Sequence, residues 1–204
     1  MLKRGEEQHG YHTLLWPMAT SAQLALYPNL TTGDPAWREI LRDVRFRHAL
    51  SLDIDRDNIN RALFLGFARS SQNTVLPQSP LYEERFASAY AAFDPQRANS
   101  LLDEMGLTDR RGDGIRLMPD GRPLEIIVET TGEGKEELDA LALIEESWKE
   151  IGVGLYAKPS QREVLRNRAL SGSLVMSMWH GWDNGIPTPD MSPDELVPVH
   201  GDVL

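Results

Sequence analysis

Apolar residues recur at intervals of three and four in two long stretches of the chain, a spacing that places them on one face of an α-helix. The first stretch begins at Pro95, where the carboxylate of Asp94 can accept hydrogen bonds from free backbone amides, and it ends at Gly106. The second runs over residues 136–150 and ends at Gly152, with acidic residues on its other side. We expect the buried faces of these two helices to contain Ala98, Leu101, Leu102, Met105, Leu138, Leu141, Ile144, Trp148 and Ile151.

Shorter helices are predicted on both sides of these two. Pro35 can open a helix over residues 35–41, because a proline in the first turn has no amide hydrogen bond to lose. Asp43 and Asp55 can each cap a further helix, and Gly66 ends the second of them. Another helix is expected over residues 162–170. In the helix after Asp55 we expect one buried face, made by Ile59, Ala62 and Leu63.

Three short apolar runs alternate with the helices and have the length and composition of β-strands. They cover residues 124–128, 153–157 and 174–178. Strand, helix, strand, helix, strand in this order predicts the α/β class, in which helices flank a mostly parallel sheet. Ligands of such sheets bind outside the carboxyl ends of the strands, so a site is expected in the residues that follow Met178.

The N-terminal part departs from this alternation. Two apolar-rich runs, residues 11–16 and 23–27, are separated by Pro17 and small polar residues, which predicts two strands or one strand with an extended return. We therefore expect residues 1–36 to form a strand-rich N-terminal segment. With 204 residues, 41% of them hydrophobic, the chain can bury one core, and residues 1–204 are expected to form a single domain.

Composition excludes several classes of function. The chain has 31 acidic and 21 basic residues and a formal net charge of -10, which argues against nucleic acid as a partner. It has no cysteine, so disulfides and thiolate metal sites are excluded, and we expect no metal and no other cofactor. Residues 1–12 lack the apolar core of a signal peptide or a membrane anchor.

The segment after the last predicted strand is rich in groups that bind small molecules. Trp179 and Trp182 offer flat apolar faces and N–H donors, and Asp183 can pair with a cation such as the amino terminus of a peptide. His180 and Asn184 add further polar groups to the same loop. The alternative is that these aromatic residues pack at the rim of the sheet and that the Asp before Asn-Gly forms a turn.

Other chemistry has less support in the sequence. The acidic stretch from Asp109 to Asp120 has part of the spacing of a calcium loop, but Arg111 occupies a ligand position and the bidentate Glu is absent, which predicts a turn and hairpin. The motifs of serine hydrolases, β-lactamases and zinc proteases do not occur. A small acidic hydrolase that uses His180 and Asp183 is the alternative hypothesis from the enzyme class.

Three stretches in the middle of the chain resemble, in order, the signatures of one protein family. The first covers residues 43–81, with two capped helices and the prolines at 77 and 80; the second, F-D-P…A…L-L-D-E-M-G at residues 93–106, resembles the family's Y-D-P…A…L-L-D-E-A-G helix. The third, residues 113–124, resembles the hairpin that follows that helix. The family is that of the extracytoplasmic solute-binding proteins of ABC transporters, specifically the peptide/nickel-binding group known as extracellular solute-binding protein family 5.

The resemblance implies one lobe of a type II periplasmic-binding-protein fold. It covers residues 37–177 and corresponds to the second lobe of these two-lobed proteins, so the first lobe would be missing from this chain. Residues 179–204 would form the ligand loop and the exit segment towards the missing first lobe. A signal peptide would have been left behind with that lobe.

The candidate segment also resembles the family's G-W-T-G-D-N-G-D-P loop, in which the Asp binds the ligand's α-amino group and the Trp lines the pocket. This resemblance implies binding roles for Asp183 and Trp179. The chain departs from the pattern in two places, since Trp182 is an additional residue and Ile186 stands where the second Asp would be. Peptides, opines and oligosaccharides are therefore all open as ligands.

The implied function is binding without catalysis. The protein would capture a peptide or other small solute in the periplasm, or elsewhere outside the cytoplasm in association with the membrane transporter, and would deliver it to ABC permease subunits. A sensor or interaction domain derived from such a lobe is the alternative from a third class.

Overall fold

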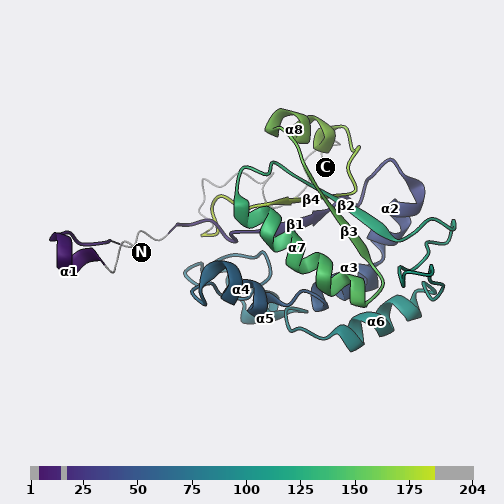
Figure 1. The fold of residues 1–204 in the computed structure, drawn as a ribbon, viewed down its shortest axis with the longest axis horizontal. Coiled ribbons are helices and arrows are strands. Elements are labelled where there is room, and N and C mark those ends of the chain that lie inside the picture. Colours follow the sequence, from purple (N-terminus) through teal and green to yellow (C-terminus); the bar gives the residue numbers. More distant parts are fainter. Residues whose placement is uncertain (1–4, 15–17, 187–204) are drawn as a thin grey trace.

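A computed structural model describes residues 5–14 and 18–186 of the chain (Figure 1). The strands are β1 (Ala25–Pro28), β2 (Glu125–Thr130), β3 (Gly154–Pro159) and β4 (Met176–Trp179). The helices are α1 (Glu6–His9), α2 (Pro35–Arg42), α3 (Val44–Leu52), α4 (Arg56–Phe64), α5 (Glu84–Ser88), α6 (Pro95–Glu104), α7 (Lys135–Glu150) and α8 (Arg162–Leu170). In the part of the chain that these coordinates describe, none of the helices combines the length and apolarity needed to cross a bilayer.

The four strands form one sheet in the order β1-β4-β2-β3. β2 pairs in parallel with β3 and with β4, and Val128 lies opposite Met176 in the second of these pairs. β1 pairs antiparallel with β4, so Ala25 lies opposite Trp179. The predicted α/β class with a mostly parallel sheet is confirmed. Because β2, β3 and β4 run in one direction, their carboxyl ends lie at the same edge of the sheet.

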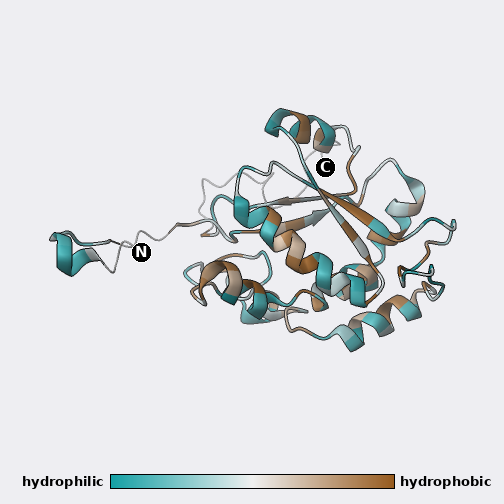
Figure 2. Ribbon diagram, in the orientation of Figure 1, coloured by the Kyte–Doolittle hydropathy of each residue, from teal (hydrophilic) through white to brown (hydrophobic). Residues whose placement is uncertain are grey.

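Helix α7 crosses one face of the sheet, and its apolar side forms the centre of the core (Figures 1 and 2). Trp148 is completely buried there, and its indole N–H donates a hydrogen bond of 3.0 Å to the backbone oxygen of Leu50 in α3. In β2, Ile126 and Val128 are fully buried, whereas Ile127 between them is 44% exposed. This alternation is expected of a strand with one fully covered face.

The short helices begin where the sequence predicts, because aspartate side chains cap their first turns. Asp43 accepts a hydrogen bond of 2.9 Å from the backbone N–H of Arg45, and Asp55 accepts one of 2.9 Å from Asn58. Asp94 caps α6 in the same way. Helix α8 has the predicted bounds. Local side-chain chemistry therefore sets these boundaries.

Two expectations about the N-terminal half are wrong. The described part of segment 1–36 contains α1, part of α2 and the single strand β1, so it is not strand-rich; residues 11–14 form no strand, which leaves the predicted alternative with one strand. β1 is the edge strand of the sheet, and no second strand lies beyond it in the described residues to supply backbone partners.

The second wrong expectation concerns the buried face of α4. Ala62 is exposed, and α4, which has no fully buried residue, packs against the core through Ile59.

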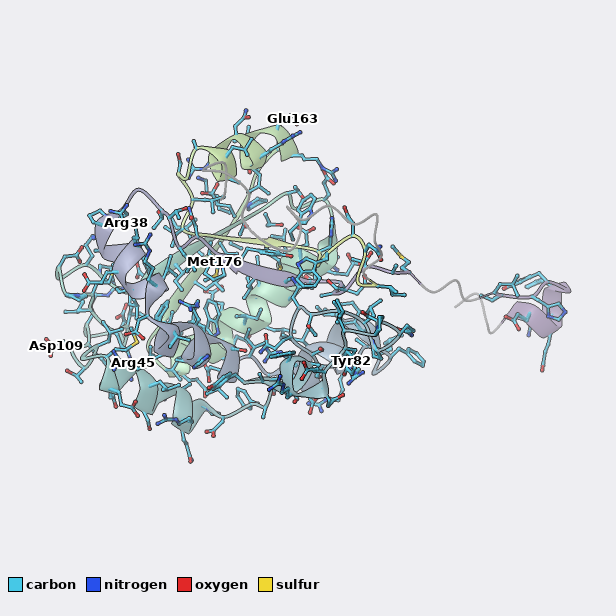
Figure 3. All side chains as sticks on the ribbon, turned by 180° about the vertical axis from the view of Figure 1, so that it is seen from behind. Arg38, Arg45, Tyr82, Asp109, Glu163 and Met176 are labelled. Atoms are coloured by element: carbon cyan, nitrogen blue, oxygen red, sulfur yellow. The ribbon has the colours of Figure 1, made fainter. Side chains whose placement is uncertain are left out.

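The hairpin predicted after α6 is present. Bridges join Arg110 to Arg116 and Leu117 to Pro123. Asp113, one of the acidic residues with calcium-like spacing, instead pairs with the guanidinium of Arg111. Figure 3 shows that Asp109, at the start of this stretch, lies at the periphery of the molecule, whereas Met176 of β4 lies near its centre.

Candidate ligand-binding site

The five candidate side chains lie at the carboxyl end of β4, at the edge where β2 and β3 also end. Trp179 is the last residue of β4, and His180, Trp182 and Asn184 are half-buried in the turn after it. Asp183 is the most exposed of the five, with 81% of its side chain accessible. The structure thus brings these residues together in one turn, and their role in binding stays a prediction.

Aromatic and charged groups are closely spaced at the start of this turn. The imidazole of His180 lies 5.0 Å from the indole of Trp179, with the ring planes 43° apart. The guanidinium of Arg162, in α8, lies over the same indole at 5.2 Å from its centre. Nδ1 of His180 is 3.5 Å from Oδ1 of Asp183. The turn therefore presents a carboxylate beside an aromatic surface, which suits a ligand with a cationic group and an apolar part.

Backbone hydrogen bonds hold the turn against the segment that precedes β1. The N–H of Gly181 donates to the oxygen of Ala22 (2.8 Å), and the N–H of Ser21 donates to the oxygen of Trp182 (2.9 Å). Further along, the N–H of Gly185 donates to the oxygen of Ala19 (2.6 Å). The turn therefore extends the antiparallel pairing of β1 with β4 beyond the sheet. Its backbone is consequently well defined, as binding sites require.

The geometry does not supply the nucleophile of a hydrolase. Nδ1 of His180 lies 2.7 Å from the carbonyl oxygen of Gly181, and since a carbonyl only accepts, Nδ1 carries the proton. The hydroxyl of Ser21 reaches the turn, but it bonds to the amide of Trp182 and to Asn73 instead of the imidazole. Within residues 5–14 and 18–186, no hydroxyl is hydrogen-bonded to this imidazole, so the hydrolase hypothesis lacks its activated nucleophile.

A shallow hollow lies at the same edge of the sheet, at the carboxyl ends of β2 and β3. It has a volume of about 520 Å³ and is lined by Thr131, Glu133, Pro159, Ser160, Gln161, Arg162 and Glu163. Arg162 joins this hollow to the turn, because its guanidinium contacts Trp179 and also pairs with Glu133 at 2.7 Å. Polar groups from three parallel strands therefore gather at one edge, as expected for a ligand face.

Sequence reasoning missed a larger cavity of about 570 Å³ that lies beside the turn. Its walls come from residues 20–28, from α3 and α4, from residues 68–73 and from α7. None of the five candidate residues lines it, but Ser21 and Asn73 line the cavity and also support the turn. No signal in the sequence points to this cavity, because its lining residues are brought together only by the tertiary fold.

Among the described residues, the charged side chains that line this cavity are all arginines, and each is already hydrogen-bonded. Arg56 donates to the backbone oxygen and the hydroxyl of Ser51, at 2.8 and 2.9 Å. Burial lowers the pKa of Arg56 to about 10. Arg47 donates to backbone oxygens at the end of α2, and Arg69 pairs with Glu84. All three guanidinium groups therefore already have hydrogen-bond partners within the chain.

The described residues contain no group of three or more His, Asp or Glu side chains that could hold a metal ion. The expected absence of a metal and of any other cofactor stays a prediction.

Comparison with known proteins decides the family. The family model described as bacterial extracellular solute-binding proteins, family 5 Middle, matches residues 6–199. The chain belongs to this family. A solved structure of the oligopeptide-binding protein OppA has a TM-score of 0.80 and 37% identity, and the match covers 88% of this chain and 28% of that one. The dipeptide-binding protein of Escherichia coli (strain K12) is 27% identical over 172 residues, which are 82% of this chain and 30% of that protein.

More distant relatives share the fold of this family 5 chain. NikA from Brucella suis, solved in complex with Fe(III)-EDTA, has 23% identity and a TM-score of 0.69, with 88% of this chain and 34% of that one covered. The chain spans less than a third of the dipeptide-binding protein and 28% of OppA. The resemblance to family 5 and the fold class, both inferred from the sequence, are confirmed, and the relatives named here are binding proteins rather than enzymes.

Proposed function

We propose that this chain is the second lobe of the solute-binding component of an ABC transporter and that it captures a peptide or similar small solute outside the cytoplasm. The family match over residues 6–199 is the observation that carries this proposal. The names of the relatives support peptides as the first class to test, since one is a dipeptide-binding and another an oligopeptide-binding protein. Permease subunits and a first lobe of the same protein would be its partners.

The candidate turn supports a ligand with a free ammonium group. Asp183 offers an exposed carboxylate, and its neighbours Trp179 and Trp182 offer apolar surface for a side chain of the solute. A solute that touches both lobes only when they are closed would stabilise the closed state, because a ligand shifts a conformational equilibrium by its difference in affinity for the two states. Capture would then follow from binding alone, without chemistry.

Replacing Asp183 by Asn in the full-length protein is expected to weaken binding of peptides with a free amino terminus about 10- to 100-fold, because a hydrogen bond to a charged group contributes about 1.5–3 kcal/mol. Isothermal titration calorimetry with di- to pentapeptides measures this effect. N-acetylated peptides should bind the wild type and the variant equally weakly. Asp109→Asn is the control, since Asp109 lies at the periphery, away from β4 (Figure 3).

Two results would contradict the proposal. The first is a full-length protein that binds neither peptides nor alpha-galactosides. The latter ligand class is suggested by the periplasmic alpha-galactoside-binding protein of Rhizobium meliloti, which is 30% identical over 105 residues. The second is an Asp183→Asn variant with unchanged peptide affinity, which would remove Asp183 from the site. Permease and ATPase genes beside the reading frame would favour transport over the sensor alternative.

The 204-residue chain by itself is expected to bind the same peptides at least about 100-fold more weakly than the full-length protein. One lobe supplies only part of the contacts made in a closed complex, and each loss of 1.4 kcal/mol lowers affinity about tenfold. Calorimetry on the two proteins under identical conditions makes the comparison. Micromolar binding by the chain alone would show that this lobe contains the complete site.

A further inference from the structure

A chain of hydrogen bonds runs beneath the candidate turn and joins three segments that are far apart in the sequence. The backbone N–H of Trp182 donates to Oγ of Ser21 at 2.6 Å, and this hydroxyl donates to Oδ1 of Asn73 at 2.6 Å. The amide nitrogen of Asn73 donates to the hydroxyl of Tyr27 at 3.1 Å. Tyr27 in turn donates to the backbone oxygen of His180 at 2.9 Å. This hydrogen-bond chain therefore begins and ends on the turn.

The direction of this hydrogen-bond chain is dictated by the chemistry of its two ends. The carbonyl of His180 can only accept, so the proton of the Tyr27 hydroxyl points to it, and Tyr27 must accept from Asn73. The backbone N–H of Trp182 can only donate, so Ser21 accepts there and uses its own proton for Asn73. An asparagine amide, with an acceptor at one side and a donor at the other, satisfies both neighbours at once.

The space above this hydrogen-bond chain is filled by the turn itself. A Cβ atom on Gly181 would lie 2.3 Å from Oγ of Ser21 and 2.5 Å from Oδ1 of Asn73, which is closer than real contacts allow. A Cβ atom on Gly185 would lie 2.8 Å from Cγ of Leu76. The turn therefore rests directly on Ser21, Asn73 and the 73–76 segment, and its two glycines permit this approach.

We propose that Ser21, Tyr27 and Asn73 are positioning residues, which fix the backbone on both sides of Gly181 and so hold Asp183 and the two indoles in one orientation before a solute arrives. The ligand part of this inference rests on the proposed function. The physical benefit is preorganisation, because a turn that is already ordered loses less conformational freedom when the ligand binds. Ser21 and Asn73 also line the 570 Å³ cavity, so the same two residues couple the turn to its wall.

The test uses Tyr27→Phe and Asn73→Asp in the full-length protein. Tyr27→Phe removes only the hydroxyl that holds the His180 carbonyl. Asn73→Asp keeps the shape but replaces the amide donor with an acceptor, so the proton of Tyr27 turns to the new carboxylate and the His180 carbonyl loses its partner. Tyr82→Phe is the matched control, because that hydroxyl is not part of this hydrogen-bond chain and bonds instead to exposed Arg69 and Glu84.

Hydrogen–deuterium exchange measured by mass spectrometry is the first readout. We expect exchange of residues 180–185 to be at least about fivefold faster in both variants and unchanged in the control, with the rest of the domain exchanging as in the wild type. Wild-type exchange in this segment, or an equal acceleration across the whole domain, would overturn the proposal. If Asn73→Asp does not fold, Ser21→Ala breaks the same hydrogen-bond chain at its other end, and the exchange rate of residues 180–185 in that variant decides the proposal in the same way.

Peptide affinity is the second readout, and it separates positioning from general stability. The ratio of affinities for free-amine and N-acetylated peptides should fall about fivefold or more in Tyr27→Phe, because Asp183 is no longer held in place. A variant that keeps this ratio would overturn the inference even if its overall affinity or thermal midpoint decreases. If the wild type binds no peptide, the proposed function fails, whereas the exchange result still decides whether the three residues hold the turn.

Discussion

Replacing Arg116 by Met is expected to destabilise the chain by about 3–5 kcal/mol, because it removes several hydrogen bonds of a buried guanidinium and each hydrogen bond to a charged group contributes about 1.5–3 kcal/mol. Only 1% of this residue is exposed. Its guanidinium donates to the backbone oxygen of Ile151 (2.7 Å), to the carboxylate of Asp103 (2.6 Å) and to the side-chain oxygen of Asn99 (2.9 Å), and it also binds the backbone oxygen of Leu107. Methionine would fill much of the volume but would leave the buried backbone oxygen of Leu107 unpaired, and the Ile151 and Asn99 oxygens would keep only their hydrogen bonds to Arg110, at 3.4 and 3.1 Å.

Urea unfolding followed by circular dichroism measures this loss. The control is Arg97→Met, because Arg97 pairs with Glu104 on the surface, where the two side chains are 50% and 47% exposed. Exposed pairs of this kind contribute about 0–1 kcal/mol, so the control should unfold close to the wild type. Equal losses in the two variants would show that Arg116 does not hold the hairpin, α6 and the end of α7 together.

The elements of this fold that could be predicted from the sequence are those whose signals are local. Asp43, Asp55 and Asp94 cap helices within three residues of themselves, and the structure shows each of these bonds. The apolar stripe of α7 needs only its own spacing to be recognised. Local patterns also predict the three parallel strands, and their alternation with helices was enough to infer the class of the fold.

The features that could not be predicted depend on contacts across long sequence separations. Nothing near Ser21 indicates that its hydroxyl would meet Asn73, which lies 52 positions away, or the amide of Trp182, which lies 161 positions away. Ala62 follows the helical spacing but is exposed, because spacing shows which residues share a face and not whether that face is covered. The same limit explains why the cavity beside the turn was missed.

The candidate site is an intermediate case. Its place after the last predicted strand and its composition both point to the turn after β4, since indoles, a carboxylate and glycines are concentrated there. The reason for Gly181 could not be read from composition, because it lies in the hydrogen-bond chain below the turn. Sequence therefore indicated which residues could meet a solute, and only the tertiary structure shows which residues hold them.

Replacing Asp53 by Asn is expected to stabilise the chain at pH 8 by a few kcal/mol. Asp53 has no exposed surface, and neither oxygen of its carboxylate has a hydrogen-bond partner among the described residues. Burial raises its pKa from 3.8 to about 7, and the negative charge of Glu150 acts in the same direction. A difference of about 3 pKa units between the folded and unfolded states corresponds to about 4 kcal/mol when the group is fully ionised.

The sign of the pH dependence follows from the raised pKa. Well below pH 3.8 the carboxyl of Asp53 is protonated in both states and its ionisation contributes nothing to the difference, whereas between about pH 4 and pH 7 the unfolded state ionises first, so the wild type progressively loses stability relative to the variant. The advantage of Asp53→Asn, measured by urea unfolding, should therefore be about 1–2 kcal/mol at pH 5 and about 3–4 kcal/mol at pH 8. Asp109→Asn, at the periphery in Figure 3, should show no such trend. A pH-independent difference between wild type and Asp53→Asn would mean that Asp53 ionises normally in the folded chain. Ionisation there is energetically costly, because the carboxylate is enclosed and no described residue donates a hydrogen bond to it.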